Sequence, residues 1–153
     1  MVAVQELGHA VLYVGNLERS VAFYGGVLGW KQIPGTLPGA PVAAFSSGRT
    51  HHELLLIEVG EDAAHNPPGR RVGLYHLGLK VGESDDELRE MLARLQEFPD
   101  LVTIVGASDH HVTHSLYVLD PDGNEIELFV DVPGVDWRND PSKFNAPVRP
   151  LHL

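Results

Sequence analysis

The chain contains the stretch Leu7-Gly8-His9-Ala10-Val11-Leu12-Tyr13-Val14-Gly15 and repeats its pattern 67 positions later, as Leu74-Tyr75-His76-Leu77-Gly78-Leu79-Lys80-Val81-Gly82. Both stretches are rich in apolar residues that alternate with a period of two, which predicts a β-strand in each. A repeated unit of this size indicates two similar halves that pack on each other. If the halves pair symmetrically, His9 and His76 face one another.

The length and composition suit one compact domain or two small, tightly joined halves. The chain has 153 residues, of which 43% are hydrophobic, and a domain of this length can bury a single core. No apolar run reaches the ~18 residues that a membrane span needs, and no secretory signal pattern opens the chain. Cysteine is absent, which excludes disulfides, zinc–thiolate sites and thiol nucleophiles. We therefore expect a cytoplasmic protein that does not associate with membranes.

The charge of the chain bears on its partners. The formal net charge is −10 with histidine neutral, and lysine and arginine are scattered, whereas binding to a nucleic acid needs a basic surface. We therefore expect no nucleic-acid partner. The chain also has nine histidines, and histidine is both the commonest metal ligand and the side chain that titrates nearest to neutral pH.

The first half is expected to contain a strand, a helix and three more strands. Asn16 can cap a helix that begins at Leu17, and Gly29 helps to end it. The strands of this half are expected at 7–14, 30–33, 42–46 and 51–59.

The second half repeats this order. A strand at 75–81 precedes a helix whose start is marked by Ser84 and Glu87, a capping-box pair. Further strands are expected at 101–105, 114–119 and 124–131, and Asp120-Pro121-Asp122-Gly123 joins the last two as a turn. Two such βαβββ modules predict an α+β fold, with a cupped, mixed but mostly antiparallel sheet and its helices on the outside. The modules are expected at 5–60 and 74–132, with a linker at 61–73 and a C-terminal tail at 133–153.

The alternation of side chains in the strands brings three polar groups together. In the last strand Ile126 and Leu128 share one face, so Glu127 points to the other. His76 lies opposite the apolar face of its own strand, and the repeat gives His9 the matching direction. Two histidines and one carboxylate, with the remaining positions open, form the facial triad of non-haem Fe(II) oxygen chemistry. Around a divalent metal this set leaves one net positive charge, which suits an anionic chelating substrate.

These residues resemble the vicinal oxygen chelate superfamily, which includes glyoxalase I, fosfomycin- and bleomycin-resistance proteins and extradiol ring-cleaving dioxygenases. The resemblance extends over roughly residues 5–132 and implies the paired modules, a divalent metal on His9, His76 and Glu127, and a homodimer. It is carried by Gly8-His9, by segments 17–24 and 27–30, by Tyr75-His76-Leu77-Gly78-Leu79, and by Leu116-Tyr117-Val118-Leu119-Asp120-Pro121-Asp122-Gly123-Asn124-Glu125-Ile126-Glu127-Leu128.

Within the superfamily, three positions resemble the one-domain extradiol dioxygenases. A doubled histidine enters the 51–59 strand where these enzymes have an acid–base histidine, a role that the resemblance gives to its second member, His52. Tyr117 lies ten residues before Glu127, where the family has a tyrosine that hydrogen-bonds a substrate oxygen. His110 lies in a segment that resembles one whose histidine approaches substrate or oxygen. His111 stands where that family segment has glycine.

Two other functions stay open at this point. Glyoxalase-type members use a glutamate from the 51–59 strand as a fourth metal ligand, and Glu53 lies beside His52. Because a strand alternates its side chains, only one of the two can face the site, and a one-residue change of register exchanges them. With Glu53 as a ligand, the protein would be an isomerase or lyase that uses Ni(II) or Zn(II). A metal-free protein that binds drug-like molecules is the third alternative.

The leading expectation is an Fe(II)-dependent ring-cleaving dioxygenase, with Mn(II) as the alternative metal. The resemblance implies a small catechol-like aromatic that chelates the metal through its vicinal oxygens, and dioxygen as the second substrate. The metal would act as Lewis acid and template. His52 would exchange a proton with the substrate, Tyr117 would donate a hydrogen bond to a substrate oxygen, and His110 would stabilise the reduced oxygen species.

Overall fold

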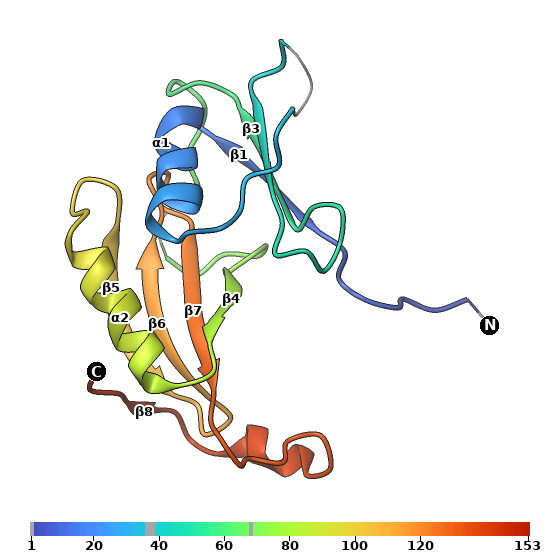
Figure 1. The fold of residues 1–153 in the computed structure, drawn as a ribbon, viewed down its shortest axis with the longest axis vertical. Coiled ribbons are helices and arrows are strands. Elements are labelled where there is room, and N and C mark those ends of the chain that lie inside the picture. The colour runs from blue at the N-terminus through green and yellow to red at the C-terminus, as the bar shows by residue number, and fades with distance from the viewer. Residues whose placement is uncertain (1, 36–38, 68) are drawn as a thin grey trace. The chain divides into compact units, whose positions relative to one another are not determined.

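Figure 1 shows the computed structural model of the chain, which describes residues 2–35, 39–67 and 69–153. The chain forms two compact units, Met1–His65 and Asn66–Leu153. Each unit has its own sheet and at least one helix, so the predicted mixed α+β class is confirmed. Residue 68, inside the expected linker, and residues 36–38, in the loop before the expected strand at 42–46, lie outside the described residues.

The first unit is a three-stranded sheet with one helical segment. Its strands are β1 (Ala10–Val14), β2 (Val42–Phe45) and β3 (Leu54–Glu58), and β3 lies between β1, which is parallel to it, and β2, which is antiparallel. The helix α1 (Leu17–Val21) continues into a π-helical segment, η1 (Ala22–Val27), and α1 contacts β2 and β3. The buried apolar side chains of this unit are Leu12, Val14, Phe23, Tyr24, Val27, Ala43, Ala44, Phe45, Leu54 and Leu56.

The start of α1 follows the prediction. The side chain of Asn16 accepts a hydrogen bond from the backbone N–H of Arg19 at 3.0 Å. The carboxylate of Glu58, the last residue of β3, accepts a bond from the N–H of Leu17 at 2.7 Å. Both bonds satisfy N–H groups that have no partner inside the helix. Asn16 therefore sets the first residue of the helix, and Glu58 ties that end to the sheet.

The strand predicted at 30–33 does not form. The N–H of Trp30 bonds to the carbonyl of Tyr24 at 2.9 Å, so this residue completes the helical segment instead of entering a ladder. Gln32 makes a single isolated bridge to Phe45. The first unit therefore has one strand fewer, within the described residues, than the expected βαβββ order.

The strand predicted at 51–59 is wrong at its start. β3 begins at Leu54, because residues 46–53 form a loop in which the hydroxyl of Ser46 donates to the carbonyl of Thr50 at 2.7 Å. His52 and Glu53 thus precede the assigned strand, although the backbone of Glu53 still bonds to Phe45 and Ala10.

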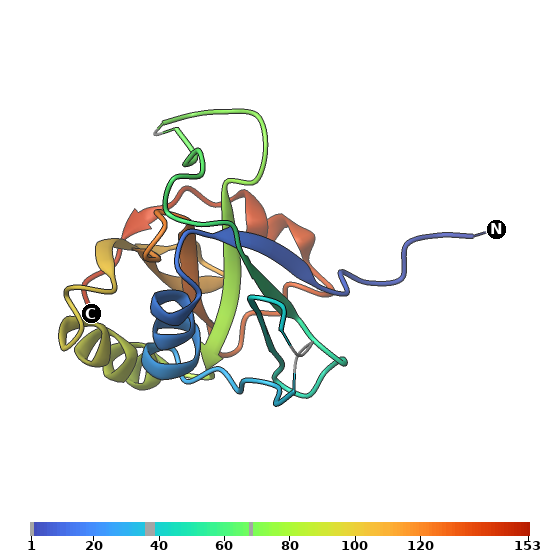
Figure 2. The same ribbon diagram turned by 90° about the horizontal axis from the view of Figure 1, so that it is seen from above.

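The second unit is a five-stranded sheet with a helix on one face. Its strands lie in the order β4-β7-β6-β5-β8, with β4 parallel to β7 and the other pairs antiparallel. The helix α2 (Asp85–Gln96) lies along this sheet in Figures 1 and 2 and contacts β4, β6 and β7. The other elements are β4 (His76–Gly82), β5 (Thr103–Asp109), β6 (Thr113–Leu119), β7 (Glu125–Asp131), the 3-10 helix η2 (Pro141–Asn145) and β8 (Arg149–Pro150).

The hairpin between β6 and β7 confirms the turn prediction. Gly123 has a φ of 82°, and its N–H bonds to the carbonyl of Asp120 at 3.0 Å. The carboxylate of Asp120 accepts bonds from the N–H groups of Asp122 and Asn124. This turn fixes the register of the hairpin, in which Tyr117 lies opposite Glu127.

Strand β7 has the predicted alternation. Ile126, Leu128 and Val130 are buried, whereas Glu125 and Glu127 lie on the other face and remain partly exposed. The two carboxylates are therefore available on the face that the apolar core does not use.

No helix in the described part of the chain could cross a membrane. The longest of them, α2, has 12 residues, whereas a span takes about 20 apolar residues.

We expect that Asn16→Ala lowers the free energy of unfolding by about 1 kcal/mol, because the N–H of Arg19 loses its acceptor at the helix start. Asn16→Asp keeps the acceptor and should stay close to wild type. Urea unfolding followed by circular dichroism measures both variants. Equal losses for the two substitutions would show that the cap does not stabilise α1.

Candidate active site

His76 and Glu127 come from two neighbouring strands and meet. His76 is the first residue of β4, which pairs in parallel with β7. Its Nε2 lies 3.0 Å from Oε2 of Glu127, and the two side chains are 26% and 16% exposed. An imidazole nitrogen and a carboxylate oxygen at this distance are two of the three expected metal ligands, held by adjacent strands.

The second oxygen of Glu127 is bound by two hydroxyl groups of β6. Oε1 accepts a hydrogen bond from the hydroxyl of Ser115 at 2.6 Å and one from Tyr117 at 3.2 Å. The phenol oxygen of Tyr117 also lies 2.7 Å from Nε2 of His110. A continuous series of polar contacts therefore runs from His110 through Tyr117 and Glu127 to His76.

The surroundings of Tyr117 keep its phenol protonated. Burial raises the pKa of Tyr117 well above the ordinary value of 10.0, and the negative charge of Glu127 raises it further. A phenol in this environment is a hydrogen-bond donor at every physiological pH.

The loop after β5 separates the two neighbouring histidines. His111 has a φ of 66°, the left-handed conformation that favours glycine, which matches the family position that it replaces. Its backbone N–H donates to the carboxylate of Asp109 at 2.7 Å, and its Nε2 lies 3.0 Å from the carbonyl of Pro147 in the tail. His110 is therefore the one that contacts Tyr117, and His111 binds the tail.

The first unit brings three histidines together. Because β1 and β3 are parallel, His9, just before β1, and His52, just before β3, lie at the same end of the pair. The ring centroids of His9 and His52 are 4.4 Å apart, and His51 is in ring contact with both. The residue expected as a metal ligand and the residue expected as an acid–base group are thus neighbours.

The pKa of His52 is lowered from its ordinary value of 6.5. Removal of the ring from water is the main cause, and the nearby rings of His51 and His9 add to it. The imidazole of His52 is therefore unprotonated at neutral pH, the state in which it can accept a proton.

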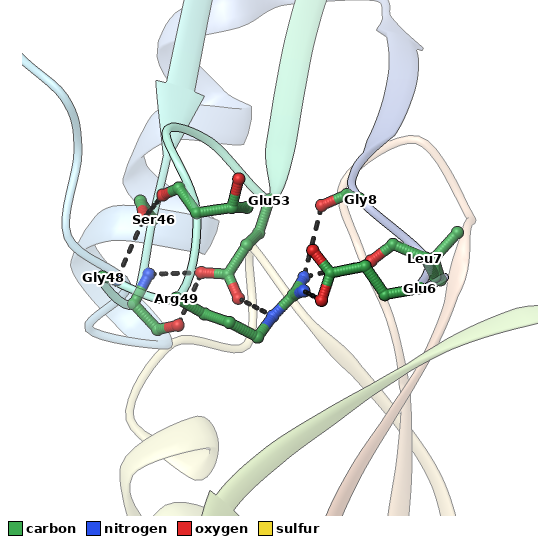
Figure 3. Close-up of polar contacts among 9 residues, drawn as sticks. Glu6, Leu7, Gly8, Ser46, Gly48, Arg49 and Glu53 are labelled. Carbon is green, nitrogen blue, oxygen red and sulfur yellow. Dashed lines mark hydrogen bonds and ion pairs between the residues drawn. The ribbon is translucent and has the colours of Figure 1, made fainter. Parts of the chain in front are cut away.

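Glu53 is engaged by other protein groups. Its carboxylate accepts hydrogen bonds from the N–H and the hydroxyl of Ser47, both at 2.5 Å. It also accepts one from Nε of Arg49 at 2.9 Å, as Figure 3 shows. Although burial by itself raises the pKa of Glu53, these hydrogen bonds outweigh it and hold the pKa below its ordinary value. The carboxylate that could serve as a fourth metal ligand is thus ionised and already bound.

The parallel strand pairs of the two units correspond residue by residue. Ala10 lies opposite Leu54 in the first unit. Leu77, which is 67 positions after Ala10, lies opposite Ile126 in the second unit. The repeat in the sequence is therefore a repeat of the two ladders.

This correspondence identifies the counterpart of Glu127 in the first unit. Counting along the ladders from the paired positions, Glu53 corresponds to Glu125, and Leu55 corresponds to Glu127. Leu55 has no group that can bind a metal. The first unit therefore offers an apolar side chain where a symmetric four-ligand site would need a second carboxylate.

The structure gathers the predicted site residues into one group in each unit. Within the described residues, no three His, Asp or Glu side chains stand close enough to hold a metal ion by themselves. The group of the second unit is His76, His110, Tyr117 and Glu127, and the group of the first unit is His9 and His52.

Two residues of this region are absent from the sequence prediction. Ser115 is fully buried and donates to Glu127, and Glu125 has an oxygen 3.6 Å from Nδ1 of His76. The period of two could have found both, because Ser115 precedes Tyr117 by two residues and Glu125 precedes Glu127 by two. Each therefore shares a strand face with a residue that the motif does identify.

The pH dependence of stability tests the environment of Tyr117. Because the folded chain holds the Tyr117 proton more tightly than the unfolded chain, the free energy of unfolding should fall as the pH rises above about 10. Tyr117→Phe should make this fall shallower, whereas Tyr13→Phe, at a phenol that is 70% exposed, should leave it unchanged. Urea unfolding over a pH series measures the slopes, and equal slopes for the two variants would contradict the assignment.

Substitution of His111 tests the left-handed loop. His111→Ala and His111→Gly both lose the bond to Pro147, but only alanine retains the steric cost of a positive φ. The glycine variant should therefore be more stable than the alanine variant by about 1 kcal/mol, the reverse of the order within helices and strands. Urea unfolding measures the stability of the two variants. A more stable alanine variant would contradict the left-handed conformation of residue 111.

Comparisons with known proteins agree with the motifs. The model of a family described as the Glyoxalase/Bleomycin resistance protein/Dioxygenase superfamily matches residues 6–128. A catechol-2,3-dioxygenase of Bacillus subtilis is 36% identical over 134 residues, which cover 88% of this chain and 44% of that protein. A lactoylglutathione lyase of Neisseria meningitidis is 29% identical over 131 residues, 84% of this chain and 92% of the lyase.

A solved structure confirms the fold. The glyoxalase/dioxygenase from Nostoc punctiforme aligns with a TM-score of 0.66 at 22% identity, over 84% of this chain and 92% of that one. The chain spans less than half the length of the Bacillus subtilis relative, so that protein's activity does not transfer as a whole. With the family model matching most of its length, the chain belongs to the glyoxalase/bleomycin resistance/dioxygenase superfamily.

Proposed function

We propose that the protein is an Fe(II)-dependent dioxygenase that cleaves the ring of a catechol-like aromatic, with His9, His76 and Glu127 as the metal ligands. The observation that carries the proposal is the polar series that joins His110, Tyr117, Glu127 and His76. It combines two ligands with the two substrate-binding groups of the extradiol type. The similarity to a catechol-2,3-dioxygenase supports the same reaction class.

The donor set fits a divalent metal. Nδ1 of His76 is buried and has no hydrogen-bond partner within the described part of the chain, and its nearest carboxylate oxygen belongs to Glu125 at 3.6 Å. With its proton on Nδ1, the imidazole would direct the lone pair of Nε2 to the side of Glu127. Metal-binding histidines commonly direct the other ring N–H to a carboxylate in this way. Glu125 therefore suits the role of the group that orients His76.

The roles of the other residues follow from their surroundings. When bound, the metal would supply Lewis acidity and a common template for the catechol and dioxygen. His52, unprotonated beside His9, would accept a proton from a catechol hydroxyl. When substrate is bound, the hydroxyl of Tyr117 would exchange its bond to Glu127 for one to a substrate oxygen. His110, which contacts that phenol, would hold it in place and stabilise developing negative charge on oxygen.

Three protein ligands are favoured over four. A glyoxalase-type site would need a carboxylate from the first unit, and the lactoylglutathione lyase similarity keeps that class as the alternative. Leu55 occupies the position that corresponds to Glu127. The nearby carboxylate of Glu53 is bound to Ser47 and Arg49. Two histidines and one carboxylate would hold the metal and leave part of its coordination free for a chelating substrate and dioxygen.

The test is anaerobic loading of the protein with Fe(II), followed by oxygen uptake with a panel of small catechols. We expect uptake of one dioxygen for each ring cleaved, with a new absorption band from the ring-opened product. Parallel loading with Ni(II) and an assay for isomerisation of a glutathione hemithioacetal address the alternative. Full iron loading without uptake on any catechol, together with Ni(II)-dependent isomerisation, would replace the proposed reaction by the lyase reaction.

The proposed ligands have a matched control. His76→Ala and Glu127→Gln should each weaken Fe(II) binding by about 100-fold or more, since the loss of an orienting group alone costs about 10- to 100-fold. His152→Ala removes an exposed histidine of the tail and should bind Fe(II) as the wild type does. Anaerobic titration against a chelating indicator measures the affinities. Unchanged Fe(II) affinity in both variants would contradict the assignment of His76 and Glu127 as metal ligands.

A further inference from the structure

Arg49 binds the segment that precedes His9. Its Nη2 donates to the carbonyls of Leu7 and Gly8, each at 3.2 Å, and its Nε donates to Glu53 at 2.9 Å, as Figure 3 shows. Nη1 also lies 3.4 Å from the carboxylate of Glu6. One guanidinium group thus joins the chain just before His9 to the residue just after His52.

Glu53 binds the residue that follows His9. Its backbone carbonyl accepts a hydrogen bond from the N–H of Ala10 at 2.9 Å, and its carboxylate is held by Ser47 and Arg49. The peptide groups on both sides of His9 are therefore bound, one by Arg49 and the other by Glu53.

These contacts matter because β1 begins only at Ala10. His9 is exposed and precedes the ladder, so regular pairing holds its backbone on one side only, through the bond from Ala10 to the carbonyl of Glu53. A metal ligand has to be held within about 0.5 Å of the productive geometry by groups around it. The two bonds that flank His9 supply that restraint from the residues next to His52.

We infer that Arg49 and Glu53 are positioning residues that hold His9 beside His52. We call this pair the clamp, and we infer that Glu53 acts as part of it and not as a metal ligand. The inference rests on the proposed function in one respect, namely that His9 binds the metal. The clamp itself is argued only from contacts within the first unit. Glu53 corresponds in the repeat to Glu125, which lies beside His76, the other proposed histidine ligand.

Glu53 as a clamp residue and Glu53 as a metal ligand predict different effects of Arg49 substitutions on metal binding. If Glu53 belongs to the clamp, removal of either partner disturbs His9 to the same degree, and the double substitution adds little. If Glu53 binds the metal, Glu53→Gln removes a ligand, whereas Arg49→Ala frees a carboxylate and leaves metal binding intact or stronger.

The experiment uses the full chain with Arg49→Ala, Arg49→Lys, Glu53→Gln and the double variant Arg49→Ala/Glu53→Gln. Arg89→Ala is the matched control, since Arg89 also pairs with a carboxylate on the surface, at 2.6 Å in the second unit. Three quantities are measured for each: the anaerobic affinity for Fe(II), the exchange rate of the Ala10 amide hydrogen, and the cross-relaxation between the ring protons of His9 and His52 in the metal-free protein. Thermal melting confirms that each variant is folded.

The clamp predicts a joint loss in all three measurements. Arg49→Ala and Glu53→Gln should each weaken Fe(II) binding by about tenfold, at the lower end of what loss of an orienting group costs. The double variant should lose no more than either single one. The Ala10 amide hydrogen should exchange faster, and the contact between the rings of His9 and His52 should weaken. Arg49→Lys should lose less than Arg49→Ala but should not match the wild type, because an ammonium group lacks the planar fork of a guanidinium. Arg89→Ala should match the wild type.

Two results overturn the inference. One is a loss of Fe(II) affinity in Glu53→Gln without any loss in Arg49→Ala. The other is wild-type ring contact and Ala10 exchange in every clamp variant. Failure of the proposed function looks different: the wild type would not bind Fe(II), while the ring contact and the amide exchange would still respond to Arg49→Ala.

Discussion

The half-buried carboxylate of Glu127 is the constraint around which the second unit is organised. A carboxylate that leaves water needs hydrogen bonds or an opposite charge in compensation. Glu127 obtains them from Ser115 and Tyr117 on one oxygen and from His76 on the other. Each partner sits on an adjacent strand of the same sheet, so the registers of β4, β6 and β7 decide whether the group forms.

Each unit has the same kind of parallel strand pair, but the two pairs carry different side chains. In the second unit, the sheet face opposite the apolar core carries Glu125 and Glu127, which lie beside His76. In the first unit the corresponding positions hold Glu53 and Leu55. The first unit thus has a histidine and one carboxylate at the corresponding positions but no counterpart of the Glu127 carboxylate. This asymmetry favours a site with three protein ligands, which keeps more positions open for reactants.

Much of the fold could be predicted because the signals are local. Asn16 and the turn at Asp120 stabilise particular backbone hydrogen bonds, and the alternation of β7 follows directly from the period of two. The start of β3 could not be predicted in this way, because the Ser46–Thr50 loop is decided by side-chain bonds to the backbone. A propensity pattern contains no information about such bonds.

The candidate site was partly accessible from sequence for the same reason. Motif spacing identifies Tyr117 and Glu127, and their contact depends only on hairpin register. The roles of Arg49 and Glu53 depend on contacts across more than forty residues of chain, between Arg49 and the carbonyls of Leu7 and Gly8. No periodic signal marks such a pair. The sequence alone therefore left Glu53 open as a fourth ligand of the glyoxalase-type alternative, whereas its carboxylate is bound to Ser47 and Arg49.

The most direct measurement is a crystal structure of the protein prepared without oxygen and loaded with Fe(II). The account predicts one iron bound by His9, His76 and Glu127, with Glu53 still on Arg49 and water in the remaining positions. A carboxylate oxygen of Glu53 bonded to the metal, or a loaded crystal in which Glu127 carries no ion, would contradict it.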